Sequence, residues 1–573
     1  MPYPIKYIEN NLVWNIEGEC FAYYELIPFN YSFLSLEQKD AVHDAFRQLI
    51  AQNRDGKIHA LQISTESSIR AAQERSKKSV TGRLKEIACA EIDEQTENLV
   101  AALGDTQVDY RFFLGFKLVV TDKELSVKEM GKTAKNLLHD AANAIGHSFM
   151  GDFVSMPNDE IRRYIRMEKL MENKLSRRFK VRRLNKNDFG YLLEHIYGRT
   201  GTAYEDFAFT LPLKKRKRDT LVKKYDLIKP ARCLIEEKQR YLHMKSENSE
   251  SYVAYFTISD VVGELDFPSS EIFYYQEQQF DFAIDTSMNV EIITNKAALH
   301  TVRNKKKELK DLDNHAWENN SETTNQVAEA LDSVDELESV LDQSKESMYK
   351  LSYVVRVTAP DVEELKRRCN QVRDFYDDAS IKLVRPIGDM MGLHSEFIPA
   401  SKRYMNDYVQ YVTSDFLAGL GFGATQMLGE RDGIYLGYNV DTDQNVYVQP
   451  ARAAQGVKGS VTNALSGAFL GSLGGGKSLS FNLLTYYAVL NGAQALILDP
   501  KSERGLWKEK LPEIADEINI VNLTSDEENK GMLDPYIIMR KTKDAESLAL
   551  DVLTFLTGIS SRDGKLFPVL RRA

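Results

Sequence analysis

The feature that most constrains this chain is a glycine-rich stretch at residues 471–478, Gly-Ser-Leu-Gly-Gly-Gly-Lys-Ser. It fits the pattern G-x-x-x-x-G-K-[ST]. Its glycines allow backbone conformations closed to other residues and let N–H groups surround phosphate oxygens. Lys477 is predicted to reach the β- and γ-phosphates of a nucleotide, and the Ser478 hydroxyl to bind Mg²⁺. The pattern therefore predicts a P-loop nucleotide-binding fold in this part of the chain.

The sequence around the loop supports this prediction. Residues 481–490 continue as an apolar helix, which Gly492 would end. Residues 493–499 have the composition of a buried parallel strand, so the series loop, helix, strand is the one that a P-loop needs. The strand before the loop would be 468–470, which is short. The predicted cofactor-binding residues are Gly471, Ser472, Leu473, Gly474, Gly475, Gly476, Lys477, Ser478 and Leu479.

Asp499 ends the predicted strand, at the edge where an α/β sheet presents its ligands. Together with Lys477, Asp499 and Glu503 are the predicted catalytic residues, because an acid here can hold Mg²⁺ through water or polarise the attacking water. The alternative is an aspartate that caps the turn before Pro500. No other apolar strand after the loop ends in an acidic residue, so we expect part of the nucleotide-binding fold to be missing and this chain to turn over little ATP.

Composition limits the remaining possibilities. A chain of 573 residues predicts about three domains. The net charge of −10 argues against a chain coated in basic residues for nucleic acid, although a local basic groove stays possible. The four cysteines, at positions 20, 89, 233 and 369, have no metal-ligand or redox spacing, which indicates a reducing compartment. No apolar stretch approaches the roughly 20 residues of a membrane span, and the N-terminus has no signal peptide.

Local patterns predict a mixed α+β region before the loop. Residues 11–15 and 20–26 are predicted to form a hairpin, followed by a helix that Ser35 and Gln38 open as a capping box. The predicted domains are 1–290, 291–410 and 411–573, and the glycine-rich segment 415–429 predicts a linker or an irregular crossing. Further predicted strands are 59–64, 110–121, 252–259, 280–294, 351–358, 381–386, 433–440, 445–450 and 518–524, with 433–440 and 445–450 forming a hairpin.

Residues 295–350 have the pattern of two long, highly charged helices in a hairpin. Val327, Leu331, Val334, Leu341 and Met348 lie at heptad-like offsets. This apolar stripe predicts packing within the chain or a coiled-coil contact with a partner.

Two basic runs interrupt the acidic chain. Residues 174–186 contain seven basic residues and no acidic ones, and 214–218 read KKRKR. Each is either a solvated surface or a contact with nucleic acid or acidic lipid.

Taken together, these pieces resemble the large ATPases of conjugative type IV secretion systems, above all those encoded on integrative conjugative elements of Gram-positive bacteria. The resemblance covers nearly the whole chain. It rests on YIENNLVWNIEGECFAYYEL, STESSIRAAQERSK, VRNKKKELKDLDNHAW, GSLGGGKS and DPKSERG. It implies an FtsK/HerA-like P-loop motor of α/β class, with a mixed α/β N-terminal region that docks on a membrane channel and a partial RecA-like P-loop domain.

Residue by residue, Gly471, Gly476, Lys477 and Ser478 match the family's phosphate loop, and Asp499 matches its acid after the strand. The family's second acidic motif and its trans-acting arginine have no counterpart here, which puts hydrolysis by this chain in doubt.

The resemblance implies ATP and Mg²⁺ as cofactors, and a hexamer when complete. It also implies contacts with channel proteins and with transferred DNA or a relaxase complex, and a cytoplasmic location at the inner face of the membrane. The alternatives are a docking module that holds nucleotide without hydrolysis and a DNA translocase.

Overall fold

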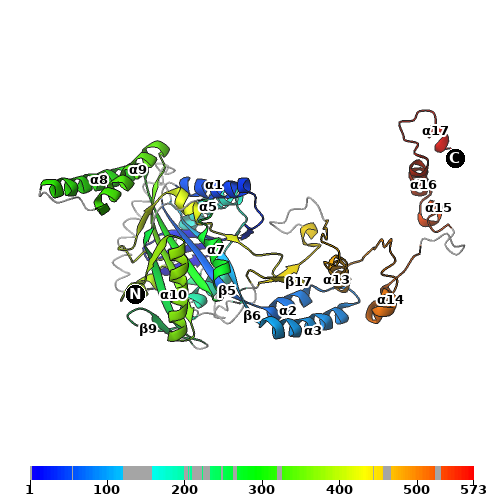
Figure 1. The fold of residues 1–573 in the computed structure, drawn as a ribbon, viewed down its shortest axis with the longest axis horizontal. Coiled ribbons are helices and arrows are strands. Elements are labelled where there is room, and N and C mark those ends of the chain that lie inside the picture. The colour runs from blue at the N-terminus through cyan, green and yellow to red at the C-terminus, as the bar shows by residue number, and fades with distance from the viewer. Residues whose placement is uncertain are drawn as a thin grey trace. The chain divides into compact units, whose positions relative to one another are not determined.

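In this computed structural model, strands rich in aromatic and β-branched residues build one large sheet (Figure 1). The chain divides into two units, residues 1–80 with 88–491, and residues 81–87 with 492–573. Each unit is described by itself. The structure describes residues 3–53, 56–119, 158–198, 204, 207–208, 222–223, 233–246, 249–261, 267–318, 325–442, 444–455, 466–522 and 531–572.

The first unit contains a sheet of 14 strands in the order β8-β1-β2-β3-β6-β5-β12-β13-β11-β10-β9, with β7 paired to β3, β14 to β11 and β15 to β13. All of its pairings are antiparallel. The strands are β1 (Ile5–Glu9), β2 (Leu12–Asn15), β3 (Cys20–Leu26), β5 (Lys57–Ser68), β6 (Thr106–Lys117), β7 (Val181–Arg183), β8 (Val222–Lys223), β9 (Leu234–Glu237), β10 (Leu242–Lys245), β11 (Glu250–Val261), β12 (Ile284–Ile293), β13 (Met348–Ala359), β14 (Ile381–Val384) and β15 (Gln410–Val412).

The sheet consists of two halves with the same order of elements, which meet where β5 pairs with β12. Along the chain, the first half reads β2–β3, α1, β5, α2–α3, β6, α5, β7, and the second reads β10–β11, α7, β12, α8–α9, β13, α10, β14. In the sheet, β2-β3-β6-β5 corresponds to β10-β11-β13-β12, and the short strands β7 and β14 pair with the equivalent strands β3 and β11. The fold of this unit is therefore an internal duplication.

The helices of the two halves have these bounds. The first half has α1 (Leu36–Ala51), α2 (Ile69–Ser79), α3 (Lys85–Leu103) and α5 (Asn158–Ser176), and α6 (Lys186–Gly198) follows β7. The second half has α7 (Ile272–Gln279), α8 (Asn295–Glu318), α9 (Asn325–Ser344) and α10 (Val362–Asp378).

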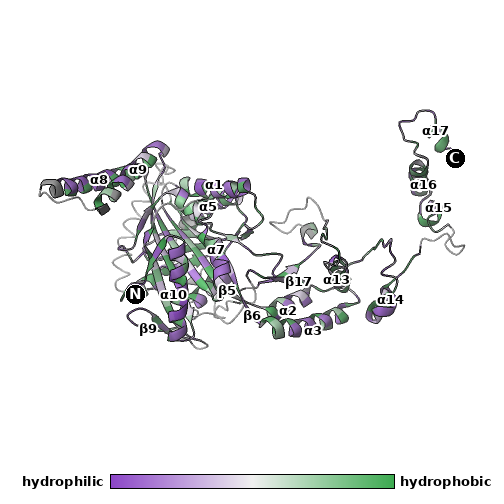
Figure 2. Ribbon diagram, in the orientation of Figure 1, coloured by the Kyte–Doolittle hydropathy of each residue, from purple (hydrophilic) through white to green (hydrophobic). Residues whose placement is uncertain are grey.

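Both faces of the sheet are buried. Neighbouring residues of a strand point to opposite faces, so Phe112 and Phe256 belong to one core cluster while Phe113 and Tyr255 belong to the other. Green, apolar segments run through the sheet in Figure 2, with paler and purple segments where strands also carry polar residues.

Many local predictions are confirmed. The hairpin of β2 and β3 forms, and Ser35 caps α1 in a reciprocal capping box with Gln38. The helical hairpin forms as α8 and α9. The hairpin after the glycine-rich segment forms as β17 (Ile434–Asn439) and β18 (Gln444–Val448).

Of the two alternatives for the glycine-rich segment 415–429, a linker or an irregular crossing, the linker is wrong. The segment contains most of α12 (Ser414–Gly419) and β16 (Ala424–Thr425), which pairs with β4 (Phe29–Asn30). Leu417, Leu420 and Phe422 are buried in the core. The strands on either side of residue 290 lie in one sheet, while the division of the chain near residue 410 stays a prediction.

The second unit holds short helices after the phosphate loop. The segments predicted as strands at 493–499 and 518–524 form no strand in their described parts, nor does 468–470 before the loop. A buried parallel strand needs neighbours that satisfy its N–H and C=O groups, and the described residues of this unit contain no strand. Leu496 and Leu498 are therefore exposed. The helices are α14 (Trp507–Lys510), η5 (Pro512–Glu517), α15 (Pro535–Ile538), α16 (Thr542–Thr557) and α17 (Phe567–Leu570).

Candidate nucleotide-binding site

The glycine-rich loop takes the backbone conformations that its glycines permit. Gly474 and Gly476 both have φ of +78°, in the left-handed region that side chains disfavour. Gly475 donates its N–H to the carbonyl of Ser472 over 3.1 Å, which closes a tight turn. The loop is exposed, so its remaining N–H groups face solvent. A chain with other residues at these two positions would lose this turn.

The loop leads directly into α13 (Lys477–Leu490), with Gly476 as the residue that precedes its first turn. The N–H groups of a first helical turn have no partner within the helix and carry the positive end of its dipole. No side chain caps this end, and its first turn has no acidic residue. The start of α13 is therefore a place where an anion such as phosphate is stabilised.

Lys477 folds back over the loop. Its Nζ donates to the carbonyl oxygen of Ser472 over 2.6 Å, and its Cγ passes Gly471 so closely that a Cβ at that position would lie 3.1 Å away. The conformation of the Lys477 side chain therefore depends on a glycine at position 471. A phosphate held by the loop would compete with the Ser472 carbonyl for the ammonium group.

Asp499 lies in the second unit, where it organises its own turn. Its carboxylate accepts the N–H of Arg504 over 2.8 Å and that of Lys501 over 3.3 Å, and the guanidinium of Arg504 lies 3.3 Å away. The N–H of Arg504 is the largest cause of a pKa below the usual value for Asp499. Glu503 lies 4.0 Å from Lys501. These contacts are those of a turn-capping aspartate, the alternative left open by the sequence.

The structure brings the predicted loop residues Gly471 to Leu479 together, since they are contiguous and lie in one unit. Whether Asp499 and Glu503 share a site with Lys477 stays a prediction, because they belong to the other unit. Among the described residues, no group of three His, Cys, Asp or Glu side chains could hold a metal ion. Mg²⁺ keeps several waters and binds proteins through few ligands and substrate phosphates, so the Ser478 hydroxyl with a bound nucleotide fits its requirements.

Sequence reasoning missed what packs beside α13. Tyr487 is half-buried, and burial, followed by the carboxylates of Glu91 and Glu94 on α3, raises its pKa. The acidic second helix of the α2–α3 hairpin therefore lies next to the helix that begins at the phosphate loop. No local pattern could have predicted this neighbour, because some 390 residues of fold separate the two helices (Glu91 and Tyr487).

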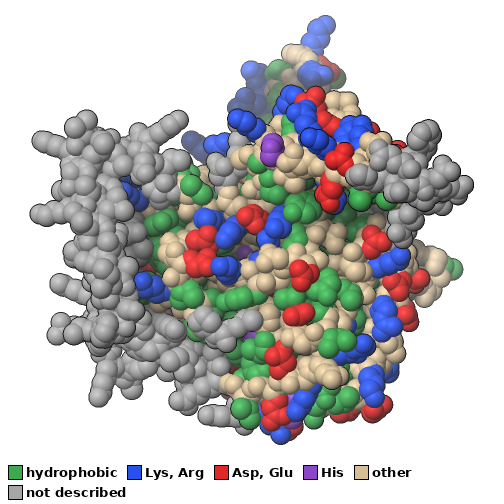
Figure 3. Space-filling model, turned by 90° about the vertical axis from the view of Figure 1, so that its left-hand side faces the viewer, with side chains coloured by type: hydrophobic (Ala, Val, Ile, Leu, Met, Phe, Trp, Pro, Cys, Tyr) green, Lys and Arg blue, Asp and Glu red, His purple; other side chains and the backbone are tan. Residues whose placement is uncertain are grey.

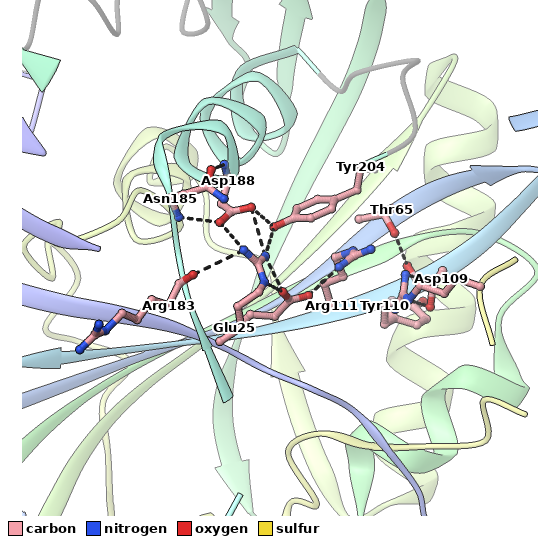
Figure 4. Close-up of polar contacts among 11 residues, drawn as sticks. Glu25, Thr65, Asp109, Tyr110, Arg111, Arg183, Asn185, Asp188 and Tyr204 are labelled. Carbon is pink, nitrogen blue, oxygen red and sulfur yellow. Dashed lines mark hydrogen bonds and ion pairs between the residues drawn. The ribbon is translucent and has the colours of Figure 1, made fainter. Parts of the chain in front are cut away.

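Two of the seven basic residues in the run 174–186, Arg182 and Arg183, pair with acidic residues. Arg182 donates to Glu25 over 2.6 Å and to Asp188 over 2.9 Å (Figure 4). Arg183 donates to Glu168 over 2.8 Å. Burial would raise the pKa of Glu25, but Arg111 and Arg182 outweigh it and hold that pKa below its usual value. These arginines are structural ion pairs. The second run, 214–218, lies outside the described residues.

The face shown in Figure 3 also combines both signs of charge. Its basic side chains lie among acidic ones rather than in a patch of one sign. Among the described helices, none combines the length and the apolar composition needed to cross a membrane.

Comparison with known proteins adds two findings. Residues 444–573, which include the phosphate loop, α13 and Asp499, match the family described as AAA-like domain. Over 577 aligned residues the chain is 20% identical to YddE, an uncharacterized protein of Bacillus subtilis (strain 168), with 95% of this chain and 67% of the relative covered. The C-terminal segment is therefore an AAA-like domain, consistent with a P-loop NTPase fold.

Proposed function

We propose that this protein is the ATP-binding motor subunit of a conjugative type IV secretion system, which energises DNA transfer or channel assembly. The AAA-like domain supports nucleotide binding. The resemblance of the N-terminal and central segments to conjugation ATPases supports the machine in which it works. In this proposal the large sheet docks on membrane channel proteins at the inner face of the cell membrane, and copies of the chain assemble as a ring.

The observation that carries the proposal is the conformation of the loop. Gly474 and Gly476 adopt the left-handed conformation, and Lys477 begins a helix whose N–H groups have no competing cap. A lysine, an open helix N-terminus and a glycine-lined turn converge within a few residues. This combination suits a nucleoside triphosphate better than a small neutral ligand.

The roles of the residues follow from their chemistry. The N–H groups of residues 474–478 bind phosphate oxygens, and Lys477 exchanges the Ser472 carbonyl for the β- and γ-phosphates. The Ser478 hydroxyl is the protein ligand of Mg²⁺, which neutralises phosphate charge when it is bound. Asp499 or Glu503 positions water, provided that its turn approaches the loop. Each of these roles is part of the proposal.

Replacing Lys477 tests nucleotide binding. We expect Lys477→Ala to abolish or greatly weaken ATP binding, because the phosphates lose their main cation, while the fold is unchanged because Lys477 is not in a core. Titration calorimetry with ATP and Mg²⁺ measures the affinity. Lys508→Ala, an exposed lysine of α14, is the matched control and should bind as the wild type does. Wild-type affinity in Lys477→Ala contradicts the assignment.

The motor role needs a second readout in the cell. In a bacterium that carries the conjugative element, the Lys477→Ala allele should reduce transfer to the level of a gene deletion, and Lys508→Ala should not. Normal transfer by an allele that no longer binds ATP would reject the motor role. It would not contradict the assignment of the nucleotide-binding site.

A further inference from the structure

The α8–α9 hairpin is an arm that extends from the sheet of the first unit (Figure 1). Its apolar residues are used inside the chain. Ala298, Val302, Leu341 and Met348 form their own core cluster, against which Leu337 and others pack. The apolar stripe predicted for this region is thus mostly intrachain packing. Hydrophilic residues recur along both helices of the hairpin, as the purple segments of Figure 2 show.

Each helix of the arm carries mainly one sign of charge. Lys296, His300, Arg303, Lys307 and Lys310 recur at spacings of three and four along α8, and this places them on one face. The sequence of α9 contains acidic residues and no basic one. The arm therefore presents a basic stripe beside an acidic helix.

Part of this charge is used within the hairpin. Arg303 donates to Glu338 over 2.8 Å, and Lys306 lies 2.7 Å from Asp335 and 2.9 Å from Glu338. These pairs define how the antiparallel helices lie against each other. They place Lys307 and Lys310 at about the level of the acidic residues near Asp332.

Four charged residues are left over at that level. Lys307 and Lys310 on α8, and Asp332 and Glu336 on α9, are exposed and make no ion pair with the described residues. A polyanion would be attracted by the two lysines and repelled by the two acids beside them. A partner that presents both signs at the same spacing satisfies all four.

The other half of the fold shows that such a hairpin can be covered. The α2–α3 hairpin also has cross-hairpin pairs, in which Lys77 lies 2.6 Å from Asp93. Its acidic helix α3 lies beside Tyr487 of α13. The equivalent acidic helix α9 leaves Asp332 and Glu336 exposed. The duplication has thus produced two hairpins that differ: α3 has a neighbour in α13, whereas Asp332 and Glu336 of α9 are left uncovered by the described residues.

We propose that the α8–α9 hairpin pairs with the same hairpin of a second copy of this chain. A two-fold axis at the level of the four unpaired charges brings the lysines of each α8 opposite the acids of each α9. The pairs are exposed, so the contact is individually weak and depends on salt. It links copies of the chain without using the phosphate loop, and its test is independent of nucleotide binding.

Charge reversal tests the pairing in the full chain. One variant carries Lys307→Glu and Lys310→Glu, which makes both helices acidic at the level of the four unpaired charges. The other carries Asp332→Lys and Glu336→Lys, which makes both helices basic at that level. Sedimentation velocity at low salt without nucleotide should show association of the wild type, and each variant alone should associate about tenfold or more weakly. An equimolar mixture of the two variants should recover the association, because each acidic helix then meets a basic one.

The control variant carries Lys305→Glu on the other side of α8 and Lys366→Glu on α10, with the same change in net charge. It should associate as the wild type does, and circular dichroism should show all variants folded. The proposal is overturned if the wild type does not associate, if either variant associates normally, or if the mixture fails to recover association. Loss of duplex-DNA binding in the Lys307 and Lys310 variant alone would instead assign the stripe to a polyanion.

Discussion

Glu277 on α7 is a carboxyl group that the fold keeps away from water. It is 8% exposed and accepts the N–H of Gln426 over 2.8 Å. Burial raises its pKa to about 8, and Asp109 contributes in the same direction, while the N–H of Gln426 opposes them. The folded protein therefore holds a proton that the unfolded chain releases at a much lower pH.

This proton makes stability depend on pH. Because the folded pKa lies above the ordinary value of 4.5, the contribution of Glu277 is fully present below that value and is lost as the pH rises through about 8. We expect Glu277→Gln, which keeps an oxygen acceptor for Gln426, to remove this decline. Urea unfolding between those pH values should give a smaller loss of stability in the variant than in the wild type, and equal slopes would contradict the buried proton.

Glu25 differs from Glu277 because its carboxylate is charged in the folded protein and pairs with arginines. Glu25 is 3% exposed and faces Arg111 and Arg182 over 2.6 Å each. Glu25→Gln leaves Arg111 buried without its counter-charge, which costs about 3–5 kcal/mol of unfolding free energy. Denaturant unfolding checks this, with the exposed Glu37→Gln as control. A loss no larger than that of the control would show that water screens the pair.

At the scale of elements, the loop and α13 depend on one another. Gly476 precedes the helix with φ of +78°, where an alanine costs about 1–2 kcal/mol in the backbone. We expect Gly476→Ala to weaken ATP binding by a factor of about ten, since the loop and the first N–H groups shift together. Calorimetry measures this, and Gly564→Ala, which has open space around it and no positive φ, should leave binding unchanged.

Local elements could be predicted from the sequence, but their assembly could not. Ser35 and Gln38 determine where α1 begins, and runs of aromatic and β-branched residues determine β2 and β3, because these signals act over a few residues. The duplication could not be predicted from the sequence, because β5 and β12 have no sequence pattern in common. The two strands also lie far apart along the chain, since Lys57 pairs with Glu291. The apolar run 493–499 was mistaken for a strand because composition does not reveal whether neighbouring strands exist.

The same distinction applies to the candidate site. The glycines predicted the loop conformation at Gly474 and Gly476, because positive φ is a local property. The hydrogen bond from Lys477 to Ser472 is also local, but the sequence does not identify the Ser472 carbonyl as its acceptor. Whether Asp499 reaches the loop depends on the placement of whole units, which no spacing in the sequence encodes.

For the whole molecule, net charge and its distribution bear on the DNA-translocase alternative. The chain has a net charge of −10, and arginines 182 and 183 of the basic run are paired with acids. We expect the purified protein to bind duplex DNA weakly and with little salt dependence. Fluorescence anisotropy at about 50 and about 200 mM salt checks this, because a protein that neutralises many phosphates loses roughly a thousandfold or more in affinity over that range. Such a steep loss would favour a translocase.

The pairing of β5 with β12, where the two halves of the sheet meet, has a consequence for folding during synthesis on the ribosome. His59 in β5 pairs with Asn289 in β12, which a ribosome synthesises only after the first half is complete. Until then, β5 is an open edge strand with unpaired backbone groups, and such edges template the pairing of other chains. A nascent chain that stalls before β12 emerges should therefore need a chaperone at that edge, whereas one that has passed it closes the edge with its own second half.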